Sequence, residues 1–205
     1  MRSLSTSRRA AIAAGVAAVA VLMAPLAAAD PQPGLLAPPR PVAELDVQRY
    51  LGTWRQLAAI PQVFNLSCAR DTTAEYALTE RGDISVHNSC VTWTGELNQI
   101  EGTATVNDPR TRAELHVSFP GVPGQDQPSG PTNYIVTALG PDYSWALVTD
   151  PTRLSGFVLA RAPQLDPATW DDVRAAITAV GQSPCVYLTS PTTGGIGDIA
   201  PLCTR

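Results

Sequence analysis

Residues 72–90 read TTAEYALTERGDISVHNSC, and this stretch decides the fold. Apolar and polar side chains alternate over residues 72–78 and again over residues 84–90, which is the pattern of two β-strands that each bury one face. Between them, residues 80–83 read ERGD and favour a tight turn, because glycine adopts positive φ without strain. The stretch therefore predicts an antiparallel β-hairpin.

The same alternation recurs on both sides of this hairpin. Further strand-like runs, separated by turn residues, cover 54–60, 100–106, 113–119, 134–139, 145–149 and 156–160. Short connections without crossover helices indicate antiparallel neighbours, and eight such strands can close into a barrel that leaves no exposed edge. We therefore predict an all-β fold, an eight-stranded antiparallel up-and-down barrel.

One segment near the C-terminus has a helical period instead. Asp166 and Pro167 form a favourable helix start, and Gly181 can end the helix. Between them, apolar residues recur at helical spacing and form one stripe: Trp170, Val173, Ile177 and Val180. We expect one α-helix packed outside the barrel, followed by a short ninth strand within residues 185–190.

The N-terminal region has the features of an export signal. Three Arg residues lie within the first nine positions, an apolar run covers residues 10–26, and three Ala residues end at Ala29. This order predicts a secretory signal peptide over residues 1–29 that is cleaved after Ala29. Residues 30–43 are rich in Pro and predict a tether, so the working domain is residues 44–205. No Cys precedes Cys68 to carry a lipid anchor, and we expect a secreted protein, extracellular or in the cell envelope.

The composition excludes some classes of function. The chain has 205 residues, of which 44% are apolar, as in a folded domain. Its formal net charge is −4, and an acidic chain lacks the basic face that nucleic-acid binding requires. We therefore predict no nucleic-acid partner.

Two motifs resemble the lipocalin family. Residues 46–54, DVQRYLGTW, have the form Asp-x-x-x-Tyr-x-Gly-x-Trp, and residues 157–163, FVLARAP, resemble the last barrel strand of the same family. The resemblance is strongest to the branch of bacterial outer-membrane lipocalins and apolipoprotein D. At residues 139–147 the chain departs from the family's middle signature, which is typically Thr-Asp-Tyr before a strand, and matches only the Ala-Leu-Val end of that signature. The resemblance implies a barrel with a ligand cavity.

Three residues of the two family motifs are expected to be structural: Gly52, Trp54 and Arg161. A guanidinium can stack on an indole face, which stabilises by about 1–2 kcal/mol when it is shielded from water. We expect Trp54 and Arg161 to seal the narrow end of the barrel rather than to contact a ligand.

The alternation also predicts which side chains line the barrel. These cavity-lining candidates are mostly apolar, with a few polar groups: Ala74, Tyr76, Ile84, Val86, Asn88, Ile100, Gly102, Ala104, Leu115, Val117, Phe119, Asn133, Ile135 and Thr137. This composition is typical of a small-molecule site. The opposite face carries a solvated set: Glu75, Ser85, Glu101, Glu114, His116 and Ser118.

The loops at the mouth of the barrel are expected at residues 60–70, 91–99, 120–131 and 150–155. Two of these loops contain an aromatic residue, Phe64 and Trp93. Loop 120–131 is long and rich in turn residues, so we expect it to be mobile.

Four Cys residues in a secreted domain should form two disulfides. Cys68 and Cys90 lie at the same end of one hairpin, which favours Cys68–Cys90 together with Cys185–Cys203. The two hairpin residues are offset when counted from the turn, so this pairing needs a β-bulge. The rival pairing is Cys68–Cys203, a strand tied to the tail as in some lipocalins. The spacing resembles no metal site.

We therefore predict a secreted lipocalin that binds or transports a small hydrophobic ligand, such as a lipid, fatty acid or isoprenoid. We expect no catalytic site and no cofactor. The sequence has no Gly-x-Ser-x-Gly nucleophile elbow, and the side chains of both His residues are predicted to point outward from their strands. Two alternatives stay open: an enzyme of lipocalin fold that acts on a lipid-like substrate, and a protein-binding module that uses the mouth loops. Peripheral contact with a membrane or lipid surface is also open.

Overall fold

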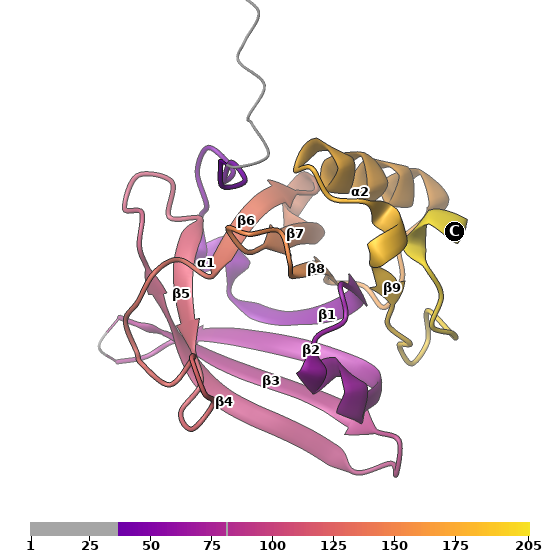
Figure 1. Ribbon diagram of the computed structural model, residues 1–205, viewed down its shortest axis with the longest axis horizontal. Coiled ribbons are helices and arrows are strands. Elements are labelled where there is room, and N and C mark those ends of the chain that lie inside the picture. Colours follow the sequence, from indigo (N-terminus) through magenta and orange to yellow (C-terminus); the bar gives the residue numbers. More distant parts are fainter. Residues whose placement is uncertain (1–36, 81) are drawn as a thin grey trace, which may run out of the picture. The chain divides into compact units, whose positions relative to one another are not determined.

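Eight antiparallel strands form a closed barrel in the order of the sequence (Figure 1). The computed structural model describes residues 37–80 and 82–205. The barrel strands are β1 (Gly52–Ala59), β2 (Cys68–Leu78), β3 (Ile84–Thr92), β4 (Leu97–Val106), β5 (Glu114–Ser118), β6 (Tyr134–Leu139), β7 (Trp145–Thr149) and β8 (Gly156–Ala160). The ring closes because β1 pairs with both β2 and β8. The predicted up-and-down barrel is confirmed.

In the described part of the chain, two α-helices and four short 3₁₀ helices accompany the barrel. Their bounds are α1 (Val47–Tyr50), η1 (Val63–Ser67), η2 (Pro141–Tyr143), α2 (Pro167–Ala179), η3 (Pro184–Val186) and η4 (Leu202–Thr204). The ninth strand is β9 (Leu188–Thr189), shorter than residues 185–190, because η3 occupies the first part of that segment. Within the described residues, no helix is both long and apolar enough to span a membrane.

The predicted signal peptide, residues 1–29, and the first part of the predicted tether lie outside the described residues. The last part of the tether lies against the barrel. The Val42 N–H donates to the Val136 carbonyl at 2.9 Å, and the Val42 side chain packs on the barrel interior. The folded domain therefore includes residues that the Pro-rich composition assigned to the tether.

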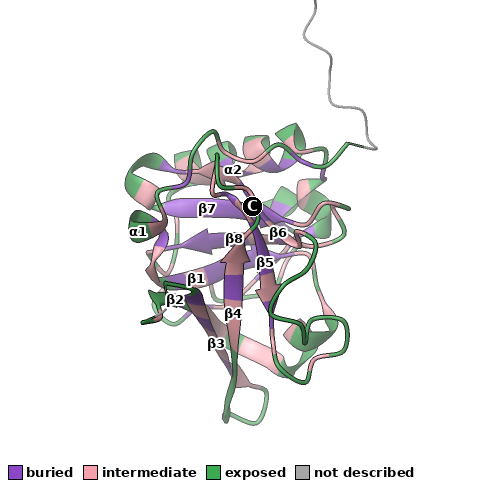
Figure 2. Cartoon of the chain, turned by 90° about the vertical axis from the view of Figure 1, so that its left-hand side faces the viewer, coloured by how far each residue is buried: buried purple, intermediate pink, exposed green. Residues whose placement is uncertain are grey.

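Helix α2 covers the outer face of β7 and β8. Asp166 caps it by accepting a hydrogen bond from the Thr169 N–H, and Val173 and Ile177 are fully buried. They pack on outward-facing apolar residues of the barrel and on Tyr187. Strand β7 is buried along its whole length, since one face meets the barrel interior and the other meets α2 (Figure 2). Residues 145–149 therefore have buried side chains on both faces of the strand, and the alternation of buried and solvated side chains expected there is absent.

One end of the barrel is sealed by Trp54 and Arg161. The Arg161 guanidinium carbon lies 3.7 Å from the centre of the Trp54 ring, and its Nη atoms donate to the carbonyls of Arg49, Leu51 and Thr53. Gly52 has φ of +88°, a conformation that a residue with a Cβ adopts only with strain. The Gly-x-Trp motif therefore sets a sharp entry into β1 that brings the indole under the guanidinium.

The loop that joins β6 to β7 packs on the same end, although its sequence departs from the family signature. The Tyr143 hydroxyl accepts a hydrogen bond from the Asp46 N–H at 2.9 Å, and the Arg49 guanidinium lies 4.5 Å from the centre of the Tyr143 ring. This loop therefore holds α1 against the closed end.

The C-terminal tail fills a gap in the barrel wall. Strand β1 pairs with β2 only over Gly52–Arg55, and its later residues Ala58 and Ala59 pair with β9 instead. The tail beyond β9 then reaches β2, where the Asp71 N–H donates to the Pro191 carbonyl at 2.9 Å. The wall near the open end is therefore completed by the tail rather than by a direct β1–β2 ladder.

Candidate functional site

The barrel interior is the candidate site. Its buried apolar cluster is formed by side chains from α1, all eight strands and the segments just before α1 and β5: Leu45, Tyr50, Trp54, Ala74, Tyr76, Ile84, Val86, Ala104, Ala113, Leu115, Val136, Ala146, Val148 and Leu159. Other apolar side chains of this cluster are only partly buried, among them Val117, Phe119, Tyr134 and Phe157. Solvent therefore reaches part of the inner face.

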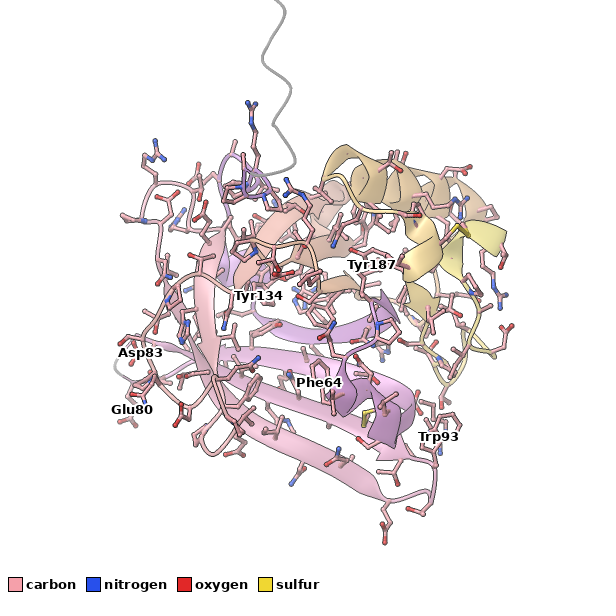
Figure 3. All side chains as sticks on the ribbon, viewed as in Figure 1. Phe64, Glu80, Asp83, Trp93, Tyr134 and Tyr187 are labelled. Carbon is pink, nitrogen blue, oxygen red and sulfur yellow. A yellow bond between two sulfur atoms is a disulfide. The ribbon has the colours of Figure 1, made fainter. Side chains whose placement is uncertain are left out.

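Exposure along the inner face increases toward one end. On β4, Ala104 is 3% exposed, whereas Ile100 is 37% exposed. Ala104 pairs with Ile84 and Ile100 pairs with Asn88, so both side chains share the inward face of the sheet. The barrel is closed at the Trp54 end and open at the end that carries η1 and the β3–β4 hairpin. Figure 3 shows Phe64 and Trp93 at this open end, and Glu80 and Asp83 at the opposite end of β2 and β3.

Three tyrosines meet near the closed end. The Tyr134 hydroxyl lies 2.6 Å from the Tyr50 hydroxyl and 3.0 Å from the Tyr76 hydroxyl. The Tyr50 ring stacks on the Tyr76 ring at 5.5 Å between centroids and lies 5.0 Å from the Trp54 ring. Burial raises the pKa of Tyr76 to about 12 and raises the pKa values of Tyr50 and Tyr134 well above 10.0. All three hydroxyls are therefore neutral at physiological pH and can donate hydrogen bonds.

Asn88 supplies a further polar group on the inner face. Its Oδ1 atom is buried and accepts no hydrogen bond from any described residue. Asn88 pairs with Ala74 and Ile100, while its neighbour Val86 two positions away pairs with Tyr76. Asn88 therefore lies about 7 Å closer to the open end than the Val86–Tyr76 pair.

The structure brings together most of the predicted cavity-lining residues. Eight belong to the interior cluster: Ala74, Tyr76, Ile84, Val86, Ala104, Leu115, Val117 and Phe119. Asn88, Ile100 and Gly102 share the same face by strand pairing. At Gly102, a Cβ would lie 2.6 Å from Cδ1 of Phe119, so the space left by this glycine is occupied by the Phe119 ring.

Three predicted lining residues do not face the interior. Ile135 alternates with Tyr134 and Val136, which belong to the interior cluster, so Ile135 lies on the outer face. Thr137 lies at a bulge, where its hydroxyl donates to the Leu147 carbonyl. The Asn133 side chain pairs with the backbone N–H and carbonyl of Val117 and thereby extends the contact between β5 and β6. The expected inward face of this strand was thus shifted by one residue.

Tyr50 and Tyr134 were missed as members of the site. Residues 134–136 are all apolar or aromatic, so hydrophobicity alone does not show which of them faces inward. Tyr50 lies in α1 rather than in a strand, so the strand pattern does not include it. The register of β6 against β7 was the missing information, since a shift of one residue reverses the faces.

His116 was expected on a solvated face, but it is buried. The loop after β5 folds back over the outer face of the barrel, and the ring nitrogens of His116 lie 2.7 Å from the Pro131 carbonyl and 3.0 Å from the Gln127 carbonyl. The loop is also held to β4 by the Thr105 hydroxyl, which donates to the Pro128 carbonyl. Residues 120–131 were expected to form part of the mouth, and instead they cover part of the outer wall.

The open end carries an apolar rim. Its large side chains are exposed to solvent: Val63, Phe64 and Leu66 on η1, Trp93 and Leu97 at the β3–β4 hairpin, and Leu154 between β7 and β8. The Trp93 indole N–H donates to the Leu66 carbonyl, and the Phe64 ring stacks on Phe157 at 6.3 Å between centroids. We call these six residues the apolar rim.

A small pocket lies beside the rim, between η1, the start of β2 and the C-terminal tail. Its volume is about 170 Å³, and Gln56, Asn65 and Arg70 contribute to its lining. The Gln56 amide donates to the Ser190 hydroxyl at 2.9 Å. Sites for drug-sized ligands occupy about 300–1,000 Å³, so this pocket is too small to be the principal site for such a ligand.

All four Cys residues form disulfides, Cys68–Cys90 and Cys185–Cys203, which is the favoured pairing. The bulge that the first bond needs is present, because the β2–β3 register shifts between Cys68 and Thr73. A mechanism with a Cys nucleophile therefore lacks its nucleophile in this oxidised form. No group of three or more His, Cys, Asp or Glu side chains that could hold a metal ion occurs in the part of the chain that the structure describes.

These features define an up-and-down β-barrel whose interior is sealed at one end and open at the other. A family model described as "Lipocalin-like domain" matches residues 45–188. The chain is 35% identical over 131 residues to temperature-induced lipocalin-1 of Arabidopsis thaliana, across 63% of this chain and 69% of that protein. It is 33% identical over 150 residues to the outer membrane lipoprotein Blc of Escherichia coli K12, across 70% of this chain and 79% of that protein.

Solved structures agree on the fold. The cockroach allergen Per a 4 matches with a TM-score of 0.55 at 19% identity, over 72% of this chain and 88% of that chain. The chain belongs to the lipocalin family, whose members generally bind small hydrophobic ligands.

Proposed function

We propose that this protein binds a small hydrophobic ligand inside the barrel and carries it outside the cytoplasm. The observation that carries the proposal is the partial exposure of inner-face side chains such as Val117, Phe119 and Ile100 inside a closed wall. Burial of apolar ligand surface against such side chains stabilises a complex by about 25 cal/mol per Å², before the costs of binding. Family membership and the apolar lining support the same proposal.

A titration with the neutral fluorescent probe N-phenyl-1-naphthylamine tests it. Ile100 and Gln99 are neighbours on β4 that face inward and outward respectively, and both are exposed enough to accept a polar substitution. We expect Ile100→Asp to weaken probe binding at least tenfold, because a carboxylate would then lie in the path of the apolar probe. The matched control Gln99→Asp should stay within twofold. Equal effects, or no saturable binding by the unmodified protein, would contradict the proposal.

Export is the second part of the proposal. The basic start, the apolar run over residues 10–26 and the small residues before Asp30 support a cleaved signal peptide, and two disulfides suit an oxidising compartment. Expression of the full chain with a C-terminal tag should give an exported product whose N-terminus is Asp30. An uncleaved product retained in the cytoplasm would contradict this part.

A lipid surface is a second candidate partner, favoured by the apolar rim. Six large apolar side chains project at the open end, through which a ligand would enter. We expect the protein to co-sediment with uncharged phosphatidylcholine vesicles, and we expect the double variant Phe64→Ser/Trp93→Ser to lose this association. Retention of full binding by that variant would show that the rim is not the contact.

A further inference from the structure

We propose that Tyr50, Tyr76 and Tyr134 form a subsite for the polar head of an uncharged amphiphile, with its apolar chain directed toward the open end. Such a ligand carries a hydroxyl or carbonyl oxygen at one end of its apolar body. This inference rests on the proposed function, because it specifies which end of the ligand reaches the floor of the barrel.

The hydrogen bonds of the three tyrosines leave one donor available. Each hydroxyl has one proton to donate, and the three hydroxyls make only two contacts among the described residues, Tyr50–Tyr134 and Tyr76–Tyr134. At least one of the three protons therefore lacks a protein acceptor. A buried donor without an acceptor is costly, so the floor of the barrel favours a ligand oxygen at this position.

The subsite favours an oxygen that carries no charge. The inward positions that surround the tyrosines on the neighbouring strands are occupied by uncharged residues, including Val86, Val136 and Leu159. The positive charge of Arg161 opposes the effect of burial on the pKa of Tyr50, but burial dominates. The Nη atoms of Arg161 are directed to backbone carbonyls, and its guanidinium lies on Trp54. A carboxylate at the floor would lose its hydration and would find the Arg161 guanidinium already engaged with backbone carbonyls, which disfavours binding.

The depth of the tyrosines also sets the orientation of the ligand. Tyr76 pairs with Gly52 at the first residue of β1, so it lies at the closed end, and the half-exposed apolar side chains lie on the side of the open end. Figure 3 shows Tyr134 among the barrel strands and Tyr187 outside them, beside the C-terminal region. A ligand whose oxygen meets the tyrosines therefore extends its apolar part past Val117 and Phe119.

Competition between two ligands of equal chain length tests the inference. 1-Dodecanol and dodecanoate displace N-phenyl-1-naphthylamine from the full-length folded protein at pH 8, where dodecanoate is fully ionised. We expect dodecanol to bind at least tenfold more tightly than dodecanoate. We expect the triple variant Tyr50→Phe/Tyr76→Phe/Tyr134→Phe, which removes every hydroxyl of the subsite, to weaken dodecanol binding about 5- to 10-fold, the effect of one lost hydrogen bond. Should the triple variant fold poorly, the comparison of dodecanol with dodecanoate on the unmodified protein still tests the subsite.

The matched control is Tyr187→Phe, which removes a hydroxyl that is equally buried but donates to Gln182 outside the barrel interior. Its dodecanol affinity should stay within twofold of the unmodified protein. If the probe binds but dodecanoate competes as well as dodecanol, or if the folded triple variant keeps full dodecanol affinity, the tyrosine subsite is wrong and the binding function stands. If the probe, dodecanol and dodecanoate all fail to bind, the binding function itself is wrong.

Discussion

Thr193 donates two hydrogen bonds to the Asp71 carboxylate, from its backbone N–H to Oδ1 at 2.6 Å and from its hydroxyl to Oδ2 at 2.8 Å. These bonds fasten the C-terminal tail to β2 at the place where β1 and β2 no longer pair. Asp71 has φ of +55°, which places its N–H toward the Pro191 carbonyl and its carboxylate toward Thr193. The Asp71 carboxylate is therefore one of the groups that hold the tail in the barrel wall near the open end.

Protonation of Asp71 should weaken this contact. Burial alone would raise the pKa of Asp71, but the hydrogen bonds from Thr193 and the ion pair with Arg70 outweigh it and hold the pKa below its ordinary value. A group whose pKa is lower in the folded state stabilises the fold above its unfolded pKa, about 4 for Asp, and loses that contribution as the pH falls through the folded value. We expect Asp71→Asn to be less stable than the unmodified protein at pH 7, and this difference should shrink as the pH falls below about 4.

Urea unfolding of both proteins at several pH values measures the difference. The comparison isolates Asp71, because the other carboxyls with lowered pKa values, Asp108, Asp150 and Asp166, are present in both proteins. A difference in unfolding free energy that stays constant with pH would show that the Asp71 carboxylate does not hold the tail.

Loss of the Arg161 guanidinium should open the closed end. Arg161→Ala removes both the stacking on Trp54 and the hydrogen bonds to three carbonyls, and we expect the free energy of unfolding to fall by about 2–3 kcal/mol. Arg161→Lys should recover little, because an ammonium cannot reproduce the planar fork. The control Arg110→Ala removes an exposed Arg paired with Asp108 at 3.8 Å and should change stability by less than about 0.5 kcal/mol. Full recovery by Lys would show that charge alone matters.

The disulfide Cys185–Cys203 should also stabilise the C-terminal tail, independently of the hydrogen bonds to Asp71. It closes a segment of 18 residues that includes β9 and Thr193, and the chain-entropy estimate for such a loop is about 3 kcal/mol. We expect the double variant Cys185→Ser/Cys203→Ser to lose about this much stability and to be cleaved within residues 190–199 by limited proteolysis. Unchanged protection of that segment would show that Asp71 holds the tail without the disulfide.

The sequence predicted the parts of this structure that depend on local pattern. The hairpin of β2 and β3 and the helix α2 with its Asp166 cap follow from residue types at short spacing. The stacking of Arg161 on Trp54, two residues far apart in the sequence, follows from the two family motifs. The residues that were misplaced depend on contacts between distant segments. The inward face of β6 is fixed by its register against β7, and the burial of His116 is fixed by backbone carbonyls of a long loop. The tail that completes the wall is held by Asp71, a residue whose role no strand or helix pattern indicates.

Gly102 should be intolerant of a side chain, because Phe119 packs on its bare backbone. An added Cβ would lie 2.6 Å from Cδ1 of Phe119 and would collide with the Ser118 carbonyl. That carbonyl belongs to β5 and cannot move without disturbing the ladder between β5 and β4. We expect Gly102→Ala to lower the free energy of unfolding by about 1–3 kcal/mol. It should also weaken N-phenyl-1-naphthylamine binding severalfold, because the Phe119 ring would be displaced into the interior. The control is Gly197→Ala, since Gly197 has open space around it and no positive φ, and its stability should change by less than about 0.5 kcal/mol. If Gly102→Ala were as stable as the control and bound the probe normally, the ring would not occupy the space over Gly102, and the interior would be larger than the structure indicates.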